Sequence, residues 1–514
     1  MSSASTGQEP SQPSPDGDMA ALAKGGRTNV MGFLLRLLAR IPFLFIAARL
    51  YGVEEMGRFA SALVVIELLA LMCSLGEKRG LAQRLTDGEG SKTNRVYDGL
   101  LLALIFSGLA GLLLWFFPAP MFPNGMNGPN DIWLIIAIPG YALTEILLAA
   151  QAYRYDIATT VRARAIVEPW TISIMAGVFF YLPATRESGL ALAYICSIFA
   201  GLLAASWPFL RTYGLPKQWR PHPFRMGKIT TRAFPLLVAD AVEWGTRRLD
   251  IFILGFFAIS DAVGIYYFAQ QIASLPQKLK TSFEPILGPV ITKNLKIGNL
   301  AAIASQVRQV GFWIIAVQAG IALALAIPGE AVMGLGGPDL VGGTGALAFL
   351  LMAEVVAATA VVAESALVYT ARKRNLAISI GTIVLQAGLT IGLIMLVNHL
   401  GFGEPFKAAA AAMALMLALG AASIVKAFLL SRILKAPVSN WRWALVYATA
   451  PAVVVGYLAT LLPEWAELIF GIPAILLTYG YVIWHKGFGP EDRVLFRKNI
   501  GGGDEGKATA EHGS

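Results

Sequence analysis

Residues 98–118 read DGLLLALIFSGLAGLLLWFFP, a stretch whose single charged residue, Asp98, stands at the first position. A helix of about 20 apolar residues is long enough to cross the hydrocarbon core of a lipid bilayer. Similar stretches recur along the chain. They lie near residues 29–51, 59–82, 132–152, 164–184, 189–210, 232–258, 262–286, 308–328, 345–370, 375–398, 408–432, 443–462 and 467–485. The pattern predicts an all-α polytopic membrane protein with about fourteen transmembrane helices.

Composition agrees with this class. Of the 514 residues, 56% are hydrophobic and only 14% are charged, and the mean hydropathy is +0.62. Soluble domains carry about 25% charged residues. The roughly ten-residue alternating segments of a transmembrane barrel are not evident. We therefore attribute the net charge of +9 to basic residues in cytoplasmic loops, and we expect no nucleic-acid partner.

The distribution of basic residues predicts the orientation. Lys and Arg collect in cytoplasmic loops. The loops that we place inside carry many basic residues, for example between 78 and 95 and between 211 and 228. The loops that we place outside carry few: Arg49, Arg58, Arg186 and Lys407. Both termini are therefore expected in the cytoplasm.

The sequence offers no pattern of catalytic or metal-binding residues. The two cysteines, Cys73 and Cys196, lie in separate apolar segments, and the four histidines fall in loops or tails. No GxxxxGK[ST] phosphate loop is present. We expect no catalytic site, no metal and no cofactor.

An internal repeat relates the two halves of the chain. The turn after the first segment contains Glu54, Gly57 and Phe59, and the turn after the seventh contains Asp261, Gly264 and Tyr266 at one offset. The same offset aligns Arg40 with Arg247. An even number of helices per half predicts parallel repeats, related by an axis along the membrane normal and enclosing a central cavity.

The repeat suggests an organisation in six parts. The expected boundaries are a cytoplasmic N-terminal tail at 1–28, a six-helix bundle at 29–211, a cytoplasmic linker at 212–231, a second six-helix bundle at 232–432, an extra helix pair at 433–486 and a cytoplasmic C-terminal tail at 487–514.

The seventh segment is unusually charged. Asp240, Glu243, Arg247 and Asp250 follow each other at i, i+3, i+7 and i+10, which is one helical face, and Arg248 stands beside them. Charge inside a bilayer costs several kcal/mol and commonly marks a functional site. These residues are expected either to line a cavity or to neutralise each other.

The first segment carries Arg36 and Arg40 at i, i+4, with no acidic neighbour on the same helix. Guanidinium groups bind phosphate oxygens in bidentate fashion and keep their charge. Two to four such groups facing one cavity would suit a pyrophosphate, and the candidates are Arg36, Arg40, Arg247 and Arg248. The alternative is that Arg36 and Arg40 pair with Glu67 or Glu77 of the second segment.

Other charges near the membrane have two interpretations. Lys278 and Lys280 follow Pro276, and they mark either a helix end at the headgroups or the mouth of a cavity. The remaining membrane carboxylates are packing residues or coupling sites for a proton or cation: Glu145, Glu168, Glu354 and Glu364.

Two stretches resemble a known family. ARLYGVEEMGRFA, residues 48–60, resembles the LGxExxGx[FY] signature of polysaccharide biosynthesis flippases in the multidrug/oligosaccharidyl-lipid/polysaccharide exporter superfamily. SLGEKRGL, residues 74–81, is similar to the family's DxGxxxx[LV] motif, although Glu77, Lys78 and Arg79 replace the usual small or hydroxyl residues. DAVGIY, residues 261–266, fits as the second copy.

The resemblance implies a bacterial inner-membrane flippase, not an enzyme. It would move undecaprenyl-pyrophosphate-linked oligosaccharide repeat units from the cytoplasmic to the periplasmic leaflet by alternating access, for exopolysaccharide or lipopolysaccharide O-antigen assembly. It implies head-group binding by Arg36, Arg40, Arg247 and Arg248, within the lipid bilayer. The same resemblance suggests polymerase and chain-length proteins of the same pathway as further partners.

Three other functions compete with this one. A multidrug/cation antiporter of the same superfamily would need a cavity dominated by carboxylates. A membrane polysaccharide polymerase or ligase would need a sizeable outer catalytic loop, whereas the outer loops here are short. A scaffold protein would not need buried arginines at matched depths.

Overall fold

The structure is a computed structural model that describes residues 41–87, 91–126, 128–281, 284–489 and 492. Helices dominate this part of the chain. They are α2 (Val53–Cys73), α3 (Glu77–Asp87), α4 (Lys92–Phe116), α5 (Ala137–Tyr153), α6 (Ile157–Val161), α7 (Glu168–Tyr181), α8 (Gly189–Tyr213), α9 (Pro223–Phe257), α10 (Ser260–Thr281), α11 (Glu284–Lys296), α12 (Leu300–Ala326), α13 (Gly329–Gly334), α14 (Thr344–Thr370), α15 (Arg372–His399), α16 (Glu404–Leu434), α17 (Ala444–Ala459), α18 (Glu464–Ala466) and α19 (Ile472–Val482). Short 3₁₀ or π turns adjoin them at η1 (Ala47–Tyr51), η2 (Asp131–Ile136), η3 (Arg162–Val167), η4 (Arg186–Ser188), η5 (Pro338–Gly343), η6 (Glu467–Gly471) and η7 (Ile483–Gly487).

The predicted fold class is confirmed. Among the described residues, ten helices, some formed by elements joined end to end, are long and apolar enough to cross a membrane. The four remaining predicted segments coincide with the shorter apolar helices Ile41–Tyr51 and Ala444–Ala459 and with the charged helices α9 and α10. The chain is thus a multi-pass α-helical membrane protein.

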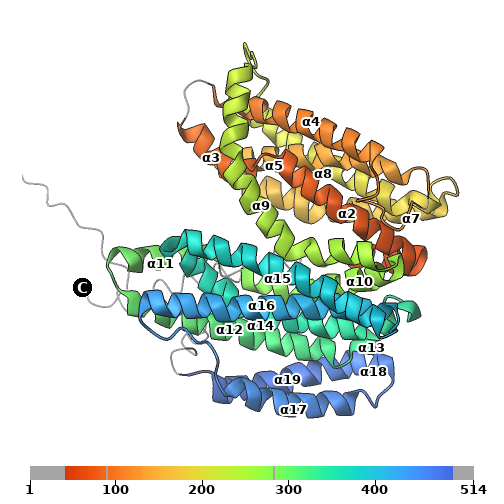
Figure 1. Cartoon of the computed structure of the whole chain (residues 1–514), viewed down its shortest axis with the longest axis vertical. Coiled ribbons are helices and arrows are strands. Elements are labelled where there is room, and N and C mark those ends of the chain that lie inside the picture. Colours follow the sequence, from red (N-terminus) through yellow and green to blue (C-terminus); the bar gives the residue numbers. More distant parts are fainter. Residues whose placement is uncertain (1–40, 88–90, 127, 282–283, 490–491, 493–514) are drawn as a thin grey trace, which may run out of the picture.

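The helices form two groups (Figure 1). One contains α2 to α8, and the other contains α10, α12, α14, α15 and α16, with α17 and α19 packed outside against α12. Small residues allow the closest packing in the second group, where buried alanines of α14 face buried alanines of α16. With only methyl side chains between them, helix backbones approach closely enough for extensive dispersion contacts in a bilayer.

Helix α9 connects the groups. It begins at Pro223, inside the segment expected as a linker, and runs diagonally from α3 and α4 toward α10 (Figure 1). Its first half packs apolar residues, including Ala233, against Leu75 and Leu102 of the first group. Farther along, Gly245 lies against Ile383 of α15, so α9 contacts both groups.

The groups touch most closely where α2 and α10 begin, at the end of the helices that we predict to be periplasmic. A Cβ atom on Gly57 would lie 1.8 Å from the carbonyl oxygen of Ser260, and one on Gly264 would lie 2.1 Å from that of Val53. The two glycines of the internal repeat therefore meet at one backbone-to-backbone crossing. Toward the opposite end, the groups diverge (Figure 1).

Replacing Gly57 with leucine should disrupt this crossing, because overpacking costs about 1–3 kcal/mol or more when the obstacle is backbone. We expect a lower thermal unfolding midpoint for the Gly57→Leu protein in detergent. The matched control is Gly108→Leu, since a Cβ on Gly108 meets nothing within 4 Å. Equal midpoints for the two variants would show that the crossing is not tight in solution.

Candidate functional site

The charged face of α9 lies where this helix passes between the two groups. Asp240 and Asp250 are buried there, whereas the side chains of Glu243 and Arg247 remain 35% and 51% exposed. The buried carboxylates need partners because an isolated charge in a low-dielectric interior is strongly unfavourable. Asp240 and Asp250 have different partners.

Arg79 of α3 supplies the partner for the first turn of this face. Its Nε lies 2.7 Å from Asp240 Oδ1, and its Nη2 lies 2.5 Å from Glu243 Oε2. One guanidinium therefore bridges two carboxylates on successive turns of α9. From the sequence, Arg79 was interpreted as a basic loop residue and as a departure from the family motif, without a partner. That departure was the signal that pointed to it.

Arg247 and Arg248 pair with carboxylates on different helices. Arg247 Nη2 lies 3.3 Å from Glu243 Oε1 on the same helix, which is one of the pairings anticipated from the spacing. Arg248 instead reaches α2, where its Nε lies 3.2 Å from Glu67 Oε2, and its Nη1 donates to Gln270 Oε1 of α10 at 3.0 Å. Arg248 thus links three helices.

Asp250 is held by uncharged groups. The Tyr266 hydroxyl donates to its Oδ2, the Gln270 amide approaches the same oxygen at 3.4 Å, and the backbone N–H of Ile251 donates to Oδ1 at 2.9 Å. Tyr266 is the aromatic residue of the second repeat motif. The motif therefore contributes a hydrogen-bond donor as well as a packing residue.

The expected partners of the first helix are occupied elsewhere. Arg36 and Arg40 lie outside the described residues. Glu67 pairs with Arg248, and buried Glu77 lies 2.9 Å from Arg84 of its own helix. In the part of the chain that the structure describes, neither carboxylate is left without a cation.

The predicted lysines lie on α10, which continues as a helix through Pro276 to Thr281. The side chains of Lys278 and Lys280 lie outside the described part. Gln318 of α12 donates to the Pro276 carbonyl at 3.1 Å, so the backbone around this proline is tied to the neighbouring helix.

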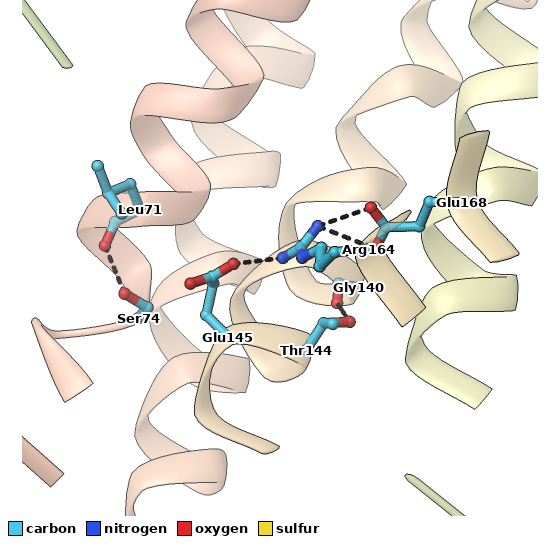
Figure 2. Close-up of polar contacts among 7 residues, drawn as sticks. All are labelled: Leu71, Ser74, Gly140, Thr144, Glu145, Arg164 and Glu168. Atoms are coloured by element: carbon cyan, nitrogen blue, oxygen red, sulfur yellow. Dashed lines mark hydrogen bonds and ion pairs between the residues drawn. The ribbon is translucent and has the colours of Figure 1, made fainter. Parts of the chain in front are cut away.

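A partly buried charge cluster lies within the first group (Figure 2). Arg164 of η3 bonds both oxygens of Glu168 at 2.9 and 3.0 Å and also pairs with Glu145 of α5. Its guanidinium carbon lies 4.4 Å from the centre of the Tyr141 ring. Arg164 thus joins α5, η3 and α7.

A similar pair lies in the second group. Buried Lys426 of α16 lies 2.9 Å from Glu364 of α14 and 3.2 Å from the hydroxyl of Ser379 on α15. The cations Arg164 and Lys426 were not anticipated as partners of these carboxylates. The i, i+4 spacing of Arg164 and Glu168 was the readable signal, whereas Lys426 and Glu364 are 62 residues apart.

Within the described residues, no three His, Cys, Asp or Glu side chains form a group that could hold a metal ion. The polar chemistry of this region consists of ion pairs and hydrogen bonds between helices. Such an arrangement can bind charged groups by exchanging partners, and it can hold helices in one relative position.

Removing Arg164 should destabilise the fold, because the carboxylates of Glu145 and Glu168 would lose the cation that neutralises them. Breaking a buried ion pair in this way lowers the free energy of unfolding by about 3–5 kcal/mol. We expect Arg164→Leu to lower the unfolding midpoint of the detergent-solubilised protein markedly. The control is Arg162→Leu, two residues away, where the arginine is exposed. A similar midpoint for both variants would contradict a structural role for the cluster.

No curated protein matches the chain in sequence. Solved structures match its fold over most of its length. An inward closed conformation of the lipid II flippase MurJ superposes with a TM-score of 0.67 at 11% identity, covering 92% of this chain and 100% of that one. A multidrug resistance MATE family transporter of the MOP superfamily, in its inward-facing conformation, gives a TM-score of 0.56 at 16% identity and covers 83% and 97%.

A MOP superfamily transporter from Pyrococcus furiosus, described as having a binding pocket of reverse polarity, gives a TM-score of 0.54 at 14% identity, covering 82% of this chain and 96% of that one. Residues 22–295, more than half of this chain, match the family model described as "Polysaccharide biosynthesis protein". That span includes both repeat motifs and the charged face of α9. The chain therefore belongs to the polysaccharide biosynthesis protein family, within the fold shared by flippases and transporters of the MOP superfamily.

Proposed function

We propose that this protein is a flippase for undecaprenyl-pyrophosphate-linked oligosaccharide repeat units in the bacterial inner membrane, with both termini in the cytoplasm. It would carry the units from the cytoplasmic to the periplasmic leaflet for surface polysaccharide assembly. The observation that carries this proposal is the position of Arg247: it lies on the helix between the two groups, with its side chain half exposed. Family membership supports the same substrate class.

The cations of α9 are suited to partner exchange. Arg247 is bound by one carboxylate at 3.3 Å, and Arg248 by one carboxylate at 3.2 Å. A pyrophosphate offers more acceptor oxygens and more charge than a single carboxylate, and arginine binds phosphate in bidentate fashion. In the absence of substrate, Glu243 and Glu67 would neutralise the arginines. Substrate would displace them, while Arg36 and Arg40 remain proposed members of the same site.

Alternating access explains how the head group would cross. The Gly57–Gly264 crossing brings α2 and α10 together at the predicted periplasmic end. The groups diverge toward the end where the basic loops lie (Figure 1). In this state the head group would approach from the cytoplasm, and the polyprenyl tail would stay in the lipid. Export would require the crossing to open and the opposite ends to close.

A second candidate has one observation in its favour. In the described part of the α9 region, the acids Glu67, Asp240, Glu243 and Asp250 lie among the cations Arg79, Arg247 and Arg248, with Lys78 also near Asp240 and Glu243. A cationic drug would bind these carboxylates by displacing the cations. Efflux of ethidium from cells that express the protein, compared with vector alone, distinguishes this antiporter from the flippase.

The central test replaces Arg247 and Arg248 together with alanine. Each lost charge-assisted bond to phosphate is worth about 1.5–3 kcal/mol, so head-group affinity should fall by tenfold or more. We expect lipid-linked oligosaccharide to accumulate on the cytoplasmic leaflet while surface polysaccharide is lost. The matched control is Arg162→Ala with Lys228→Ala, two exposed residues away from α9's charged face. Unchanged polysaccharide in the test variant, with normal expression, would contradict the proposal.

The membrane potential should also affect transport. Each elementary charge that crosses 100 mV changes the free energy by about 2.3 kcal/mol, and an inside-negative potential favours outward movement of an anion. In reconstituted vesicles, we expect flipping of the pyrophosphate lipid to slow when the potential is collapsed with valinomycin and potassium. The same rate with and without the potential would show that the head group moves as a neutral unit.

A further inference from the structure

Helix α11 lies at the end of the molecule away from the glycine crossing (Figure 1). A hollow lies between α11 and α14. Its volume is about 540 Å³. The residues that line it come from α11, the turn after it and the end of α14. They are Gly288, Thr292, Lys293, Lys296, Ile297 and Tyr369. None of these residues, which are the lining residues within the described part of the chain, is acidic.

Two ammonium groups share one side of the hollow. Lys293 and Lys296 are three residues apart on α11, so their side chains emerge on the same side of the helix. Among the described residues, Lys296 forms no hydrogen bond or ion pair. This distinguishes it from Arg79, Arg164, Arg248 and Lys426, each of which is held by a carboxylate.

A hydroxyl group lines the same hollow from α14. The Tyr369 oxygen lies so close to the bare backbone of Gly288 that a Cβ there would be 2.9 Å from it. Among the described residues this hydroxyl also forms no hydrogen bond. The hollow therefore presents an ammonium group and a hydroxyl group, each with unused donor capacity.

The surroundings match the boundary of a membrane. Ile297, beside the lysines, is 68% exposed, which places an apolar side chain next to two cations. Three consecutive cations, Arg372, Lys373 and Arg374, open α15 directly after the end of α14. Lysine stems and exposed apolar groups together are typical of the lipid headgroup region, and clustered cations near a bilayer attract anionic lipids.

We propose that this hollow binds the phosphate group of a lipid at the membrane surface, through Lys293, Lys296 and the Tyr369 hydroxyl. Ammonium and hydroxyl donors suit phosphate oxygens, and Ile297 would contact the adjoining acyl chain. The lipid is either an anionic membrane phospholipid or a polyprenyl pyrophosphate, since both present the same phosphate chemistry. The site is separate from α9, so it does not depend on the proposed flippase function.

The test titrates purified full-length protein with phosphatidylglycerol and counts bound lipids by native mass spectrometry. Each lysine near a membrane contributes about 1 kcal/mol toward anionic lipid, so the Lys293→Gln, Lys296→Gln double variant should bind one phosphatidylglycerol about thirtyfold more weakly. The control is Lys217→Gln with Lys228→Gln, two exposed lysines that precede α9 or lie in its first turns. A Tyr369→Phe variant, which keeps the ring, should weaken binding less.

Equal phosphatidylglycerol binding by wild type and the Lys293→Gln, Lys296→Gln variant would overturn the proposal, as would an equal loss in the control. Competition with undecaprenyl pyrophosphate then identifies the source. If undecaprenyl pyrophosphate displaces phosphatidylglycerol while present at the lower concentration of the two, the site binds the polyprenyl lipid. If phosphatidylglycerol stays bound, the site binds bulk phospholipid. Flipping assays are not needed for either result, so failure of the flippase proposal would be seen separately.

Discussion

A charged side chain buried in a membrane protein costs several kcal/mol unless a partner neutralises it. The described helices meet this constraint with pairs that link different elements: Arg79 with α9, Arg248 with α2, Arg164 with α5 and α7, and Lys426 with α14. The pairs inside each group hold that group together. The pairs on α9 join elements that must separate or slide if the two groups change their relative position.

Helix α9 is therefore the element on which a change in the relative position of the two groups depends. Its first half packs on α3 and α4 and is tied by Arg79, while its later part contacts α2, α10 and α15. The opposite end of the molecule is closed by the Gly57–Gly264 crossing and by Arg49, whose Nε donates to the Leu335 carbonyl at 2.8 Å. Backbone contact and this hydrogen bond close one end, and exchangeable ion pairs lie toward the other. An anionic head group would compete with the ion pairs and leave the glycine contact untouched until the groups move.

Much of the fold could be predicted from the sequence, because apolar runs of about 20 residues are local features. The repeat also identified Gly57 and Gly264 as equivalent, although not as neighbours. The site was less accessible to prediction. Arg79 and Asp240 are 161 residues apart, and their pairing depends on how α3 and α9 pack side by side. Arg248 was expected to pair on its own helix or face a cavity, and its contact with Glu67 depends on the rotation of α2.

The most direct measurement places a fluorescent undecaprenyl-pyrophosphate oligosaccharide in vesicles that contain the purified protein and follows its appearance in the opposite leaflet with a membrane-impermeant quencher. The account predicts transfer well above that of protein-free vesicles and loss of that excess in the Arg247→Ala, Arg248→Ala protein. Transfer equal to that of protein-free vesicles, by protein shown to be folded, would contradict the central claim that this chain moves a lipid-linked sugar across the membrane.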